Sequence, residues 1–499
     1  MLMEPYNPSK LFDRPGYITL SEYVADIQHM RKWGPWKLPL TLGDRIHFFV
    51  LSLVDRFSWY RRSLSVLHPY PFSPAYRALL KYLHQQGIFD TLEEKNMLYP
   101  GFYAYHMQKV VDIAGVRRKL SSQGISRNQS LALSKAIGEI VERSITGFFD
   151  QNEEIRKASY QEMLNKCDML YPPRFHRMLE VQKQHYSQLK IDKNEVIPWV
   201  KGINLISHTP VFIPQQLTSY ARTNLQSKFI LQQPSSNGSA GFFTKEGALL
   251  RGILEVVHRD ALMVHWLTTL APQVIQLTTL PEYFQQFLKM SESFGIKLYV
   301  LNVTALPIPS IVVVAMSEQS NQPGVVMSAA AATTFYQAIE NALEEIVNLV
   351  GHLGEKIPIQ EDSNDAFIST LGRISRMGYW RGKQRVDEFR WFLSGTEVRY
   401  QDLCSQDLGK QDDHDTKKLQ QCLEVLMREG ADFFPVAYFP QHVVQKKLNF
   451  TVVQIFIPKA FPLYLTEYLG TFESERLLEF ARSKGKSDWK LNPLPHVFA

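Results

Sequence analysis

Hydrophobic residues near the start of the chain follow a helical pattern. Gly43–Val54 and Ser73–Gln86 both have the spacing of amphipathic helices. Proline-containing breaks at Pro71 and Pro100 interrupt this pattern. We therefore predict that residues 1–110 form a separate, small and mainly helical module, which serves for docking or for peptide binding.

After residue 110, helical runs alternate with short runs typical of β-strands. Leu298–Val303 and Ile311–Met316 are two such runs, and Phe434–Pro462 again alternates β-branched and aromatic residues with polar ones. This alternation predicts an α+β fold, with one mixed domain of helices and strands over residues 111–499.

One apolar stretch must be weighed as a membrane span. Leu298–Ser317 carries no charge over its twenty residues, but Asn302, Pro307 and Pro309 interrupt it. Two buried strands around a proline-containing bend explain the pattern better than a membrane helix. We therefore expect no membrane association.

Polar and proline-rich segments predict where regular structure stops. Glu361–Asp365 and Gln406–Lys418 read as exposed loops. The tail, Asn492–Ala499, is rich in proline and is not expected to be helical.

Charge and cysteine content narrow the classes of function. The formal charge of +6 is spread along the chain without a long Lys/Arg block, which argues against a nucleic-acid binder and leaves room for an anionic ligand. Ordinary solubility charge is the alternative. Cys167, Cys404 and Cys422 form no C-x-x-C pair, so neither a disulfide framework nor a zinc site is expected. Met1–Asp13 lacks the apolar run of a secretory signal, and we expect a cytoplasmic protein.

An internal sequence repeat points to a functional site. Gly138–Arg143 and Leu254–Arg259 share a glutamate, two apolar residues, a polar residue and an arginine. Ala342–Glu345 is a weaker third copy, because it keeps the small-x-x-Glu spacing of the other two. Three helices with a glutamate at matching positions suggest a common site.

The paired acidic residues suit a cation and a nucleotide. Glu139 and Glu142 project from one helix face, and Mg²⁺ is usually bound by one or two carboxylates together with substrate phosphates. Arg143 can contact a phosphate oxygen. The alternative is a solvated helix face.

The second helix favours the ligand interpretation, because it is apolar nearly all round. Its Arg251, Glu255 and Arg259 also fit a simple i, i+4 ladder. A buried polar stripe nevertheless needs partners, and a charged ligand is one candidate. The small-residue turn Ser235–Gly241 upstream allows close backbone approach to a ligand, although such turns also occur without one.

These segments resemble the YcaO family. The signature segment of the family is matched by Ser236–Gly241 with Glu246, Gly252, Glu255, Arg259–Ala261 and Trp266, and further matches are Ala136–Arg143, Trp199–Leu205 with Phe212–Pro214, and Ala338–Asn348. They occur in the order of the family and cover roughly residues 110 to 499, so the resemblance implies a YcaO-type fold.

The resemblance also implies cofactors and site residues. ATP and Mg²⁺ would lie among the glutamate-bearing helices, where Glu139, Glu142 and Glu255 would hold the metal. Nucleotide binding falls to Glu139, Glu142, Arg143, Glu255, Arg259 and Glu345, and catalysis to Arg259, His258, Pro493 and Pro495. Arg373, Arg376 and Arg381 all stay open as a further phosphate contact.

The implied activity is ATP-dependent activation of backbone amides in a ribosomally made precursor peptide. In cyclodehydratase members a Cys, Ser or Thr side chain is converted to a thiazoline or oxazoline, and relatives form thioamides or amidines. The tail resembles the Pro-x-Pro-x-Pro end of azoline-forming members, with Val497 in place of the last proline; a generic proline-rich terminus is the alternative. A leader-peptide-binding partner protein or a dehydrogenase is implied, and a homodimer is a further option.

Departures from the family pattern support a second hypothesis. His258 stands where a second glutamate is expected, Phe242 and Phe243 where Gly-Asn is common, and Gly247 where an acidic residue is common. Ser122–Gly124 occupies the place of a Gly-basic-Gly turn. Fewer oxygen ligands would weaken a Mg²⁺ site. The alternative is therefore a non-hydrolysing scaffold that recruits the precursor peptide or a partner enzyme.

Overall fold

The protein is described by a computed structural model. It describes residues 74–498 except 96, 98, 100, 114–115, 149–154, 165–167, 170–176, 179–191, 219–234, 318–323, 352–375, 377, 381, 383–384 and 465–471. These residues fold as helices and β-sheets in two compact units. The first unit comprises Met1–Met97 and Gly101–Ser144, and the second comprises Leu98–Pro100 and Ile145–Ala499.

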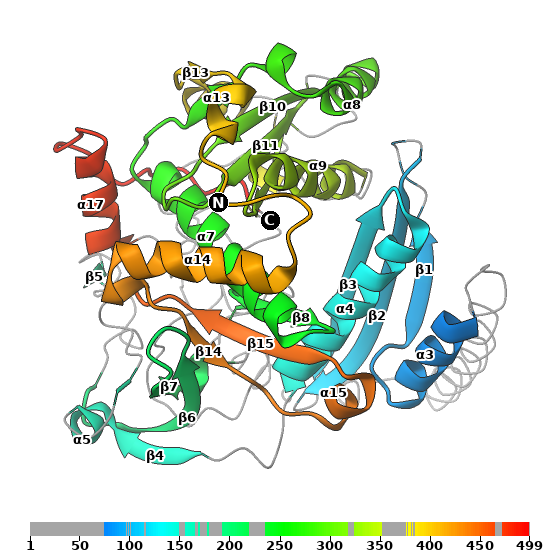
Figure 1. Ribbon diagram of the computed structural model, residues 1–499, viewed down its shortest axis with the longest axis vertical. Helices are drawn as coiled ribbons and strands as arrows, with labels where there is room; N and C mark the ends of the chain where they lie inside the picture. Colours follow the sequence, from blue (N-terminus) through cyan, green and yellow to red (C-terminus); the bar gives the residue numbers. More distant parts are fainter. Residues whose placement is uncertain are drawn as a thin grey trace, which may run out of the picture. The chain divides into compact units, whose positions relative to one another are not determined.

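The described residues of the first unit form a three-stranded antiparallel sheet with two helices. Helix α3 (Pro74–Gln85) precedes strands β1 (Thr91–Lys95), β2 (Tyr103–Ile113) and β3 (Val116–Ser126), which pair in the order β1-β2-β3 and lead into helix α4 (Gln129–Phe148) (Figure 1). Gly124 of β3 allows close packing, because a Cβ atom there would lie 1.9 Å from the Ala132 oxygen of α4.

The helix predicted over Ser73–Gln86 is confirmed as α3. The pattern in Gly43–Val54 lies outside the described residues. Strand β1 and the start of β2 also fall before residue 110, in the region where the sequence pattern was mainly helical and no strand was predicted. Strand β1 could not be predicted from an alternating pattern, because it reads Thr-Leu-Glu-Glu-Lys and has only one buried side chain, Leu92.

The first sheet of the second unit is antiparallel. Strands β4 (Arg156–Ser159), β6 (Val196–Asn204), β14 (Val436–Tyr438), β15 (Thr451–Phe456) and β8 (Ser239–Phe242) pair in that order, and β7 (Pro210–Pro214) pairs with β6. The strands predicted in Phe434–Pro462 are thus confirmed, with the short helix α15 (Val443–Leu448) between them.

The second sheet confirms the interpretation of the uncharged stretch. Strands β10 (Lys297–Asn302) and β11 (Ser310–Met316) flank the proline-containing bend and pair antiparallel. They lie between β9 (Gln273–Ile275) and β12 (Val325–Ala331), and β13 (Glu397–Val398) extends the edge. Among the described residues, no helix is long and apolar enough to cross a membrane.

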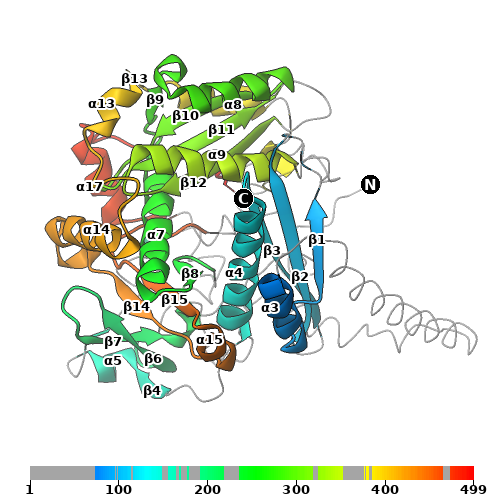
Figure 2. The same ribbon diagram turned by 45° about the vertical axis from the view of Figure 1, so that its right-hand side comes forward.

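Helices cover both faces of this sheet. Helix α9 (Phe335–Gly351) packs on β11 and β12 (Figure 2). The opposite face carries Val312, Val314 and Met316, which share a hydrophobic cluster with the C-terminal half of helix α7 (Lys245–Leu267). Every residue of β11 is buried as a result.

Helix α7 connects the two larger sheets of the second unit. Its N-terminal half packs on β15 and β8, and helix α14 (Asp415–Glu429) packs against it at an angle (Figure 1). The Thr244 hydroxyl caps α7 by accepting a hydrogen bond from the Gly247 amide at 3.1 Å. A helix in this central place is apolar on most of its circumference, as the sequence indicated.

The loop predictions hold in part. Gln406–Lys418 is loop up to His414, but helix α14 begins at Asp415, and Glu361–Asp365 lies outside the described residues. Residues 492–498 of the tail form neither helix nor strand, as predicted. Cys404 and Cys422 are free thiols.

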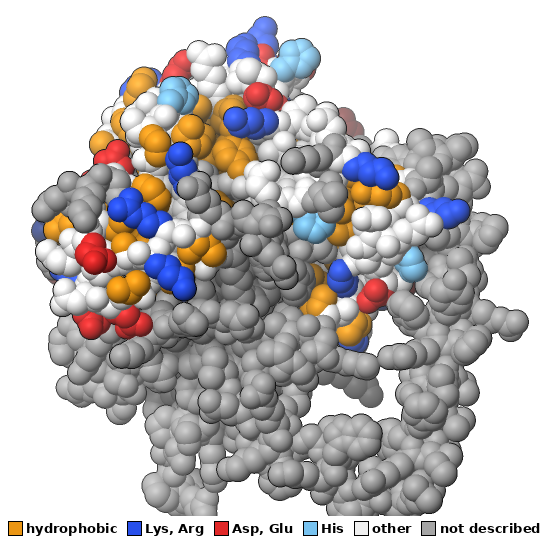
Figure 3. All heavy atoms as spheres, turned by 90° about the horizontal axis from the view of Figure 1, so that it is seen from below, with side chains coloured by type: hydrophobic (Ala, Val, Ile, Leu, Met, Phe, Trp, Pro, Cys, Tyr) orange, Lys and Arg blue, Asp and Glu red, His pale blue; other side chains and the backbone are white. Residues whose placement is uncertain are grey.

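Charge is dispersed on the surface. On the face shown in Figure 3, the Lys and Arg side chains of the described residues are scattered among acidic, polar and hydrophobic ones. This agrees with the spread of the formal charge of +6 along the sequence.

Candidate functional site

The internal sequence repeat corresponds to a repeated contact between a strand and the helix that carries the glutamate. At α4, Ser122 Oγ donates a hydrogen bond to the Ala136 carbonyl at 2.7 Å. At α9, Ser328 Oγ donates to the Ala342 carbonyl, also at 2.7 Å and across the same separation of 14 residues. The two segments therefore enter their helices in the same way.

Helix α7 keeps this spacing with glycines. Gly238 and Gly252 take the places of the serine and the alanine, and a Cβ atom on Gly252 would lie 2.9 Å from the Gly238 oxygen. In all three helices the matching glutamate follows three positions later. These glutamates are Glu139, Glu255 and Glu345.

On helix α4, Glu139 and Arg143 bind the edge of strand β3. Glu139 Oε2 accepts a hydrogen bond from the Gln123 amide at 2.7 Å, and its Oε1 lies 2.5 Å from Arg143 Nη2. Arg143 also donates to the Ser121 carbonyl. The pair therefore satisfies backbone groups of β3, a strand that leads directly into the helix.

Helix α7 carries the equivalent pair. Glu255 Oε1 lies 2.7 Å from Arg259 Nη2, and Arg259 Nη1 donates to Asn237 Oδ1 in the turn before β8. Asn237 is itself held by the Leu463 carbonyl, which accepts from its Nδ2 at 2.6 Å. The turn adopts a positive φ of 71° at Gly238, where a side chain would strike Ile455.

At this turn the backbone comes close to Ile455 of strand β15. The turn is therefore held in place by contacts within the protein. Arg259 contacts this turn through Asn237, and the close approach of a ligand to Ser235–Gly241 stays a prediction.

Arg259 retains a donor for an anion. Its Nη atoms are engaged, but its Nε is buried and has no hydrogen-bond partner among the described residues. A buried guanidinium N–H without a partner is costly, and a phosphate oxygen would satisfy it. This donor set fits a nucleotide phosphate.

His258 is neutral at physiological pH. Burial, and then the charge of Arg259, lower its pKa to about 3. Its ring lies 6.4 Å from the ring of Phe498 in the tail. It therefore supplies no charge in place of the glutamate that the family pattern has at this position.

Two of the other departures, Phe242 and Gly247, belong to one packed arrangement. The Arg251 guanidinium lies 3.6 Å from the centre of the Phe242 ring, and Arg251 Nη1 donates to Asp415 Oδ2 at 3.0 Å. A Cβ atom on Gly247 would lie 2.2 Å from the Phe242 ring and 2.7 Å from Asp415 Oδ2. Glycine at 247 is therefore what makes room for Phe242. Phe243 is 47% exposed.

Of the other assigned residues, Glu142 is half-buried on α4 and Glu345 is exposed on α9. Pro493 is exposed, whereas Pro495 is buried. Within the described ranges, no three His, Cys, Asp or Glu side chains are grouped closely enough to hold a metal ion alone. Carboxylates that bind Mg²⁺ together with phosphates need no such group.

The sequence analysis missed two acidic residues next to the site. Asp260 forms a buried ion pair with Arg476, and Asp415 pairs with Arg251. Asp260 was visible within the Arg259–Ala261 match, but its partner is more than two hundred residues away. No local pattern could identify Arg476 or Asp415.

His265, the second histidine of α7, is buried and makes the stability of the protein pH-dependent. Burial chiefly lowers the pKa of His265 to about 4, against an ordinary value near 6.5. Below pH 6.5 the unfolded chain binds a proton that the folded protein does not, so stability falls as the pH drops toward 4. From pH 7 to pH 4.5 this amounts to about 2.5 kcal/mol.

We expect urea unfolding to show a smaller acid-induced loss of stability in His265→Gln than in the wild type. Glutamine can still donate to the Leu270 carbonyl, which His265 Nδ1 contacts at 2.8 Å, but it does not titrate. Equal losses in the two proteins would contradict the assignment.

Comparison with known proteins gives a consistent result. A family model described as a YcaO cyclodehydratase that binds ATP and Mg²⁺ matches residues 123–460, more than half of the chain. No curated protein sequence matches.

Solved structures share the fold. A heterocyclase in complex with substrate and cofactor has a TM-score of 0.69 at 18% identity, over 88% of this chain and 60% of its own. YcaO from Methanopyrus kandleri, bound with AMPPCP and Mg²⁺, has a TM-score of 0.56 at 15% identity, over 78% and 91%. The E. coli microcin synthetase McbBCD complex has 0.51 at 13%, over 81% and 97%. The chain thus spans about 60% of the length of the first heterocyclase.

Proposed function

The chain belongs to the YcaO family, and from this premise we propose that it activates backbone amides of a ribosomally made precursor peptide at the expense of ATP. The cofactors of the family are ATP and Mg²⁺. The favoured reaction is cyclodehydration of Cys, Ser or Thr to a thiazoline or oxazoline.

The observation that carries this proposal is the state of Arg259. Its side chain is only 15% exposed, two of its nitrogens are fixed by Glu255 and Asn237, and its Nε has no partner among the described residues. A guanidinium fixed in this way is suited to stabilise charge on a transferring phosphoryl group.

Residues on each glutamate-bearing helix take part in the proposal. Glu139, Glu142 and Glu255 hold Mg²⁺, while Arg143, Arg259 and Glu345 contact the nucleotide. Bound Mg²⁺-ATP supplies a phosphoryl group and neutralises its charge. Glu139 and Glu255 each pair with an arginine of their own helix.

The proposed reaction removes one water from the peptide for each ring. The Cys, Ser or Thr side chain attacks the preceding carbonyl carbon, and the carbonyl oxygen accepts the phosphoryl group and leaves as phosphate. Two protons are lost, one from the nucleophile and one from the amide nitrogen. His258 is neutral, and because its N–H donates to the Leu254 carbonyl, its other ring nitrogen can serve as a hydrogen-bond acceptor here.

Mass spectrometry of a precursor peptide encoded beside the gene tests the reaction. With ATP and Mg²⁺ we expect the loss of one water mass per ring, and none when ATP is omitted. Partners are part of the proposal: a protein that binds the leader peptide, a dehydrogenase that oxidises the azoline, or a second copy of the chain.

A non-hydrolysing scaffold is the second candidate. The neutral His258 and the exposed Phe243 favour it, since they occupy positions where the family pattern has a glutamate and an asparagine. Calorimetric titration with Mg²⁺-ATP separates the two functions, because the absence of binding at millimolar nucleotide would favour the scaffold.

A further inference from the structure

A buried glutamine of strand β15 holds the turn that precedes β8. Gln454 is only 3% exposed. Its Nε2 donates to the Asn237 carbonyl at 3.3 Å and to the Leu217 carbonyl at 3.1 Å. Leu217 ends the short 3₁₀ helix η4 (Gln215–Leu217). The Gln454 amide group therefore ties the turn both to β15 and to η4.

The same turn fixes the guanidinium of Arg259. Asn237 Oδ1 accepts a hydrogen bond from Arg259 Nη1. The next carbonyl of the turn, that of Gly238, accepts from the Ile455 amide at 2.8 Å. Gln454 thus reaches Arg259 through a single intermediate residue, Asn237.

The three arginines left open as further phosphate contacts do not replace Arg259. Arg376 is fully buried, and its Nη2 donates to the Phe498 carbonyl at 3.2 Å. Arg373 and Arg381 lie outside the described residues. Arg259 has a buried Nε without a partner among the described residues, so the contacts that orient its side chain determine where this donor points.

Two further polar atoms beside the turn lack partners in the described part of the chain. Ser239 of β8 pairs with Gln454 of β15, so both side chains lie on the same face of the sheet (Figure 1). Ser239 is 7% exposed. Its Oγ and the Oε1 of Gln454 make no hydrogen bond to each other or to another described residue. Two buried polar atoms without partners are costly, and a molecule that bridges them would satisfy both.

A water molecule has the properties that such a bridge requires. Neither side chain carries a charge, so an ion held between them would be buried without a counter-charge. Directly paired residues have Cβ atoms about 5 Å apart, which suits a small molecule between their polar ends. Water donates to the Gln454 oxygen and can accept from, or donate to, the serine hydroxyl.

We propose that Gln454 is a positioning residue for Arg259, acting through Asn237, and that one buried water between Gln454 and Ser239 reinforces this support. The effect on turnover rests on the proposed function. The support of the turn does not, because it follows from contacts within the protein.

Gln454→Met tests the positioning role. Methionine keeps the length of the side chain but removes the amide group. The kcat of peptide-dependent ATP turnover should fall about tenfold, while the KM for ATP changes by less than about twofold, because Arg259 acts on the transferring phosphoryl group. Hydrogen–deuterium exchange, followed by mass spectrometry, should become about tenfold faster in the amides of the turn.

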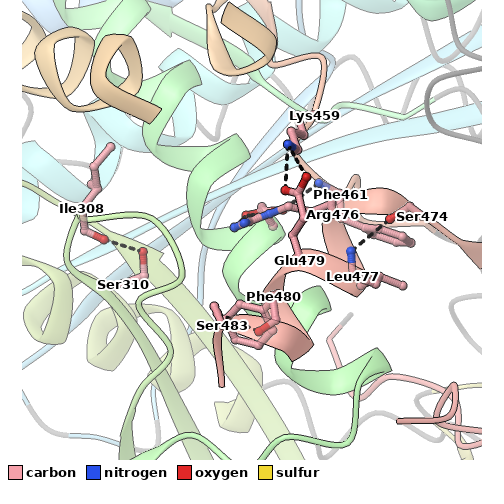
Figure 4. A network of polar contacts seen from close by, with 11 residues as sticks. Ile308, Ser310, Lys459, Phe461, Ser474, Arg476, Leu477, Glu479, Phe480 and Ser483 are labelled. Atoms are coloured by element: carbon pink, nitrogen blue, oxygen red, sulfur yellow. Dashed lines mark hydrogen bonds and ion pairs between the residues drawn. The ribbon is translucent and has the colours of Figure 1, made fainter. Parts of the chain in front are cut away.

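Ser310→Ala is the matched control. Ser310 is fully buried in strand β11 of the other large sheet, and its Oγ donates to the Ile308 carbonyl at 3.0 Å (Figure 4). Its loss removes one buried hydrogen bond without touching the turn. Stability should therefore fall, whereas kcat and the exchange rate of residues 235–241 should match those of the wild type.

Gln454→Glu adds a readout that a merely structural role would not change. A protonated carboxyl group can donate to the Asn237 carbonyl, but an ionised one cannot. Burial raises the pKa of a carboxyl group, so the protonated fraction grows as the pH falls from about 8 to about 6. The ratio of the variant kcat to the wild-type kcat should therefore rise over this range, and it should stay constant for Gln454→Met. A ratio independent of pH for Gln454→Glu, or an unchanged kcat in Gln454→Met, would overturn the positioning role.

Ser239→Ala tests the water. If the hydroxyl bonds a bridging water, its removal loses a hydrogen bond, and the equilibrium constant of urea unfolding should rise about fivefold. A crystal structure of the protein should then show a density peak within hydrogen-bond distance of Ser239 Oγ and Gln454 Oε1. A variant at least as stable as the wild type, or density without this peak, would overturn the water.

Deuterium exchange keeps the two proposals apart. If the wild-type protein hydrolyses no ATP, the enzymatic function fails, and the effect of Gln454 on turnover fails with it. The exchange rate of the turn would still decide whether Gln454 holds Asn237. An equal rate in Gln454→Met and in the wild type would overturn that support, even in a protein that turns over ATP.

Discussion

Arg259→Ala is expected to lower the rate of peptide-dependent ATP turnover by about 10³-fold, the scale on which arginines that stabilise a transferring phosphoryl group act. The guanidinium is fixed by Glu255 and Asn237, and its buried Nε is directed to no protein acceptor among the described residues. Without the guanidinium, the negative charge on the transferring phosphoryl group is no longer stabilised by Arg259. Initial rates of phosphate release measure the effect.

Arg251→Ala is the matched control for this experiment. Arg251 lies on the same helix, two turns earlier, and its 43% exposed side chain pairs with Asp415. An exposed pair of this kind contributes little to stability, so its loss should leave turnover close to that of the wild type. Equal loss of turnover in the two variants would show that α7 as a whole, and not Arg259, had been disturbed.

Glu139→Gln tests the first unit in the same assay. Glutamine still accepts the hydrogen bond from the Gln123 amide, so strand β3 keeps its partner. The substitution removes the negative charge of the carboxylate that is proposed to bind Mg²⁺. Turnover should therefore fall while the fold is retained. If Glu139→Gln and Arg259→Ala both hydrolysed ATP at the wild-type rate, the enzymatic assignment would fail.

Local patterns predicted the elements that carry the site. The two strands around Pro307 and Pro309 were readable because uncharged β-branched residues surround a break. The three glutamate-bearing helices could be predicted because a small residue recurs three positions before each glutamate. In the structure these small residues permit close contact between the helix and the preceding segment.

What the sequence could not show depends on contacts distant along the chain. The packing of Phe242 over Gly247 explains two departures together, but it involves Asp415 from another helix. The tail was predicted to be irregular, yet its hydrogen bonds to Trp266 and Trp380 follow from the tertiary fold. Likewise the first strand, β1, has too few buried residues to produce an alternating pattern.

Asp260→Ala should lower the free energy of unfolding by about 3–5 kcal/mol, the cost of leaving a buried charge unpaired. Asp260 is fully buried, and its Oδ1 accepts from Arg476 Nε at 3.0 Å and from the Phe461 amide at 2.7 Å. Arg476, from helix α17 (Glu475–Ser483), is itself only 8% exposed in its side chain and lies beside the ion pair of Lys459 and Glu479 (Figure 4).

Burial distinguishes this ion pair from the pair of Arg251 and Asp415 on the same helix. Asp415→Ala removes a half-exposed partner of Arg251 and should cost less than about 1 kcal/mol. Asp260→Leu combined with Arg476→Met replaces both buried charges by apolar side chains and should recover part of the loss, because no charge is then left uncompensated. Urea unfolding of the four proteins gives the comparison. A cost for Asp260→Ala no larger than for Asp415→Ala would mean that water reaches Arg476, and that α17 is not fixed to α7 by this pair.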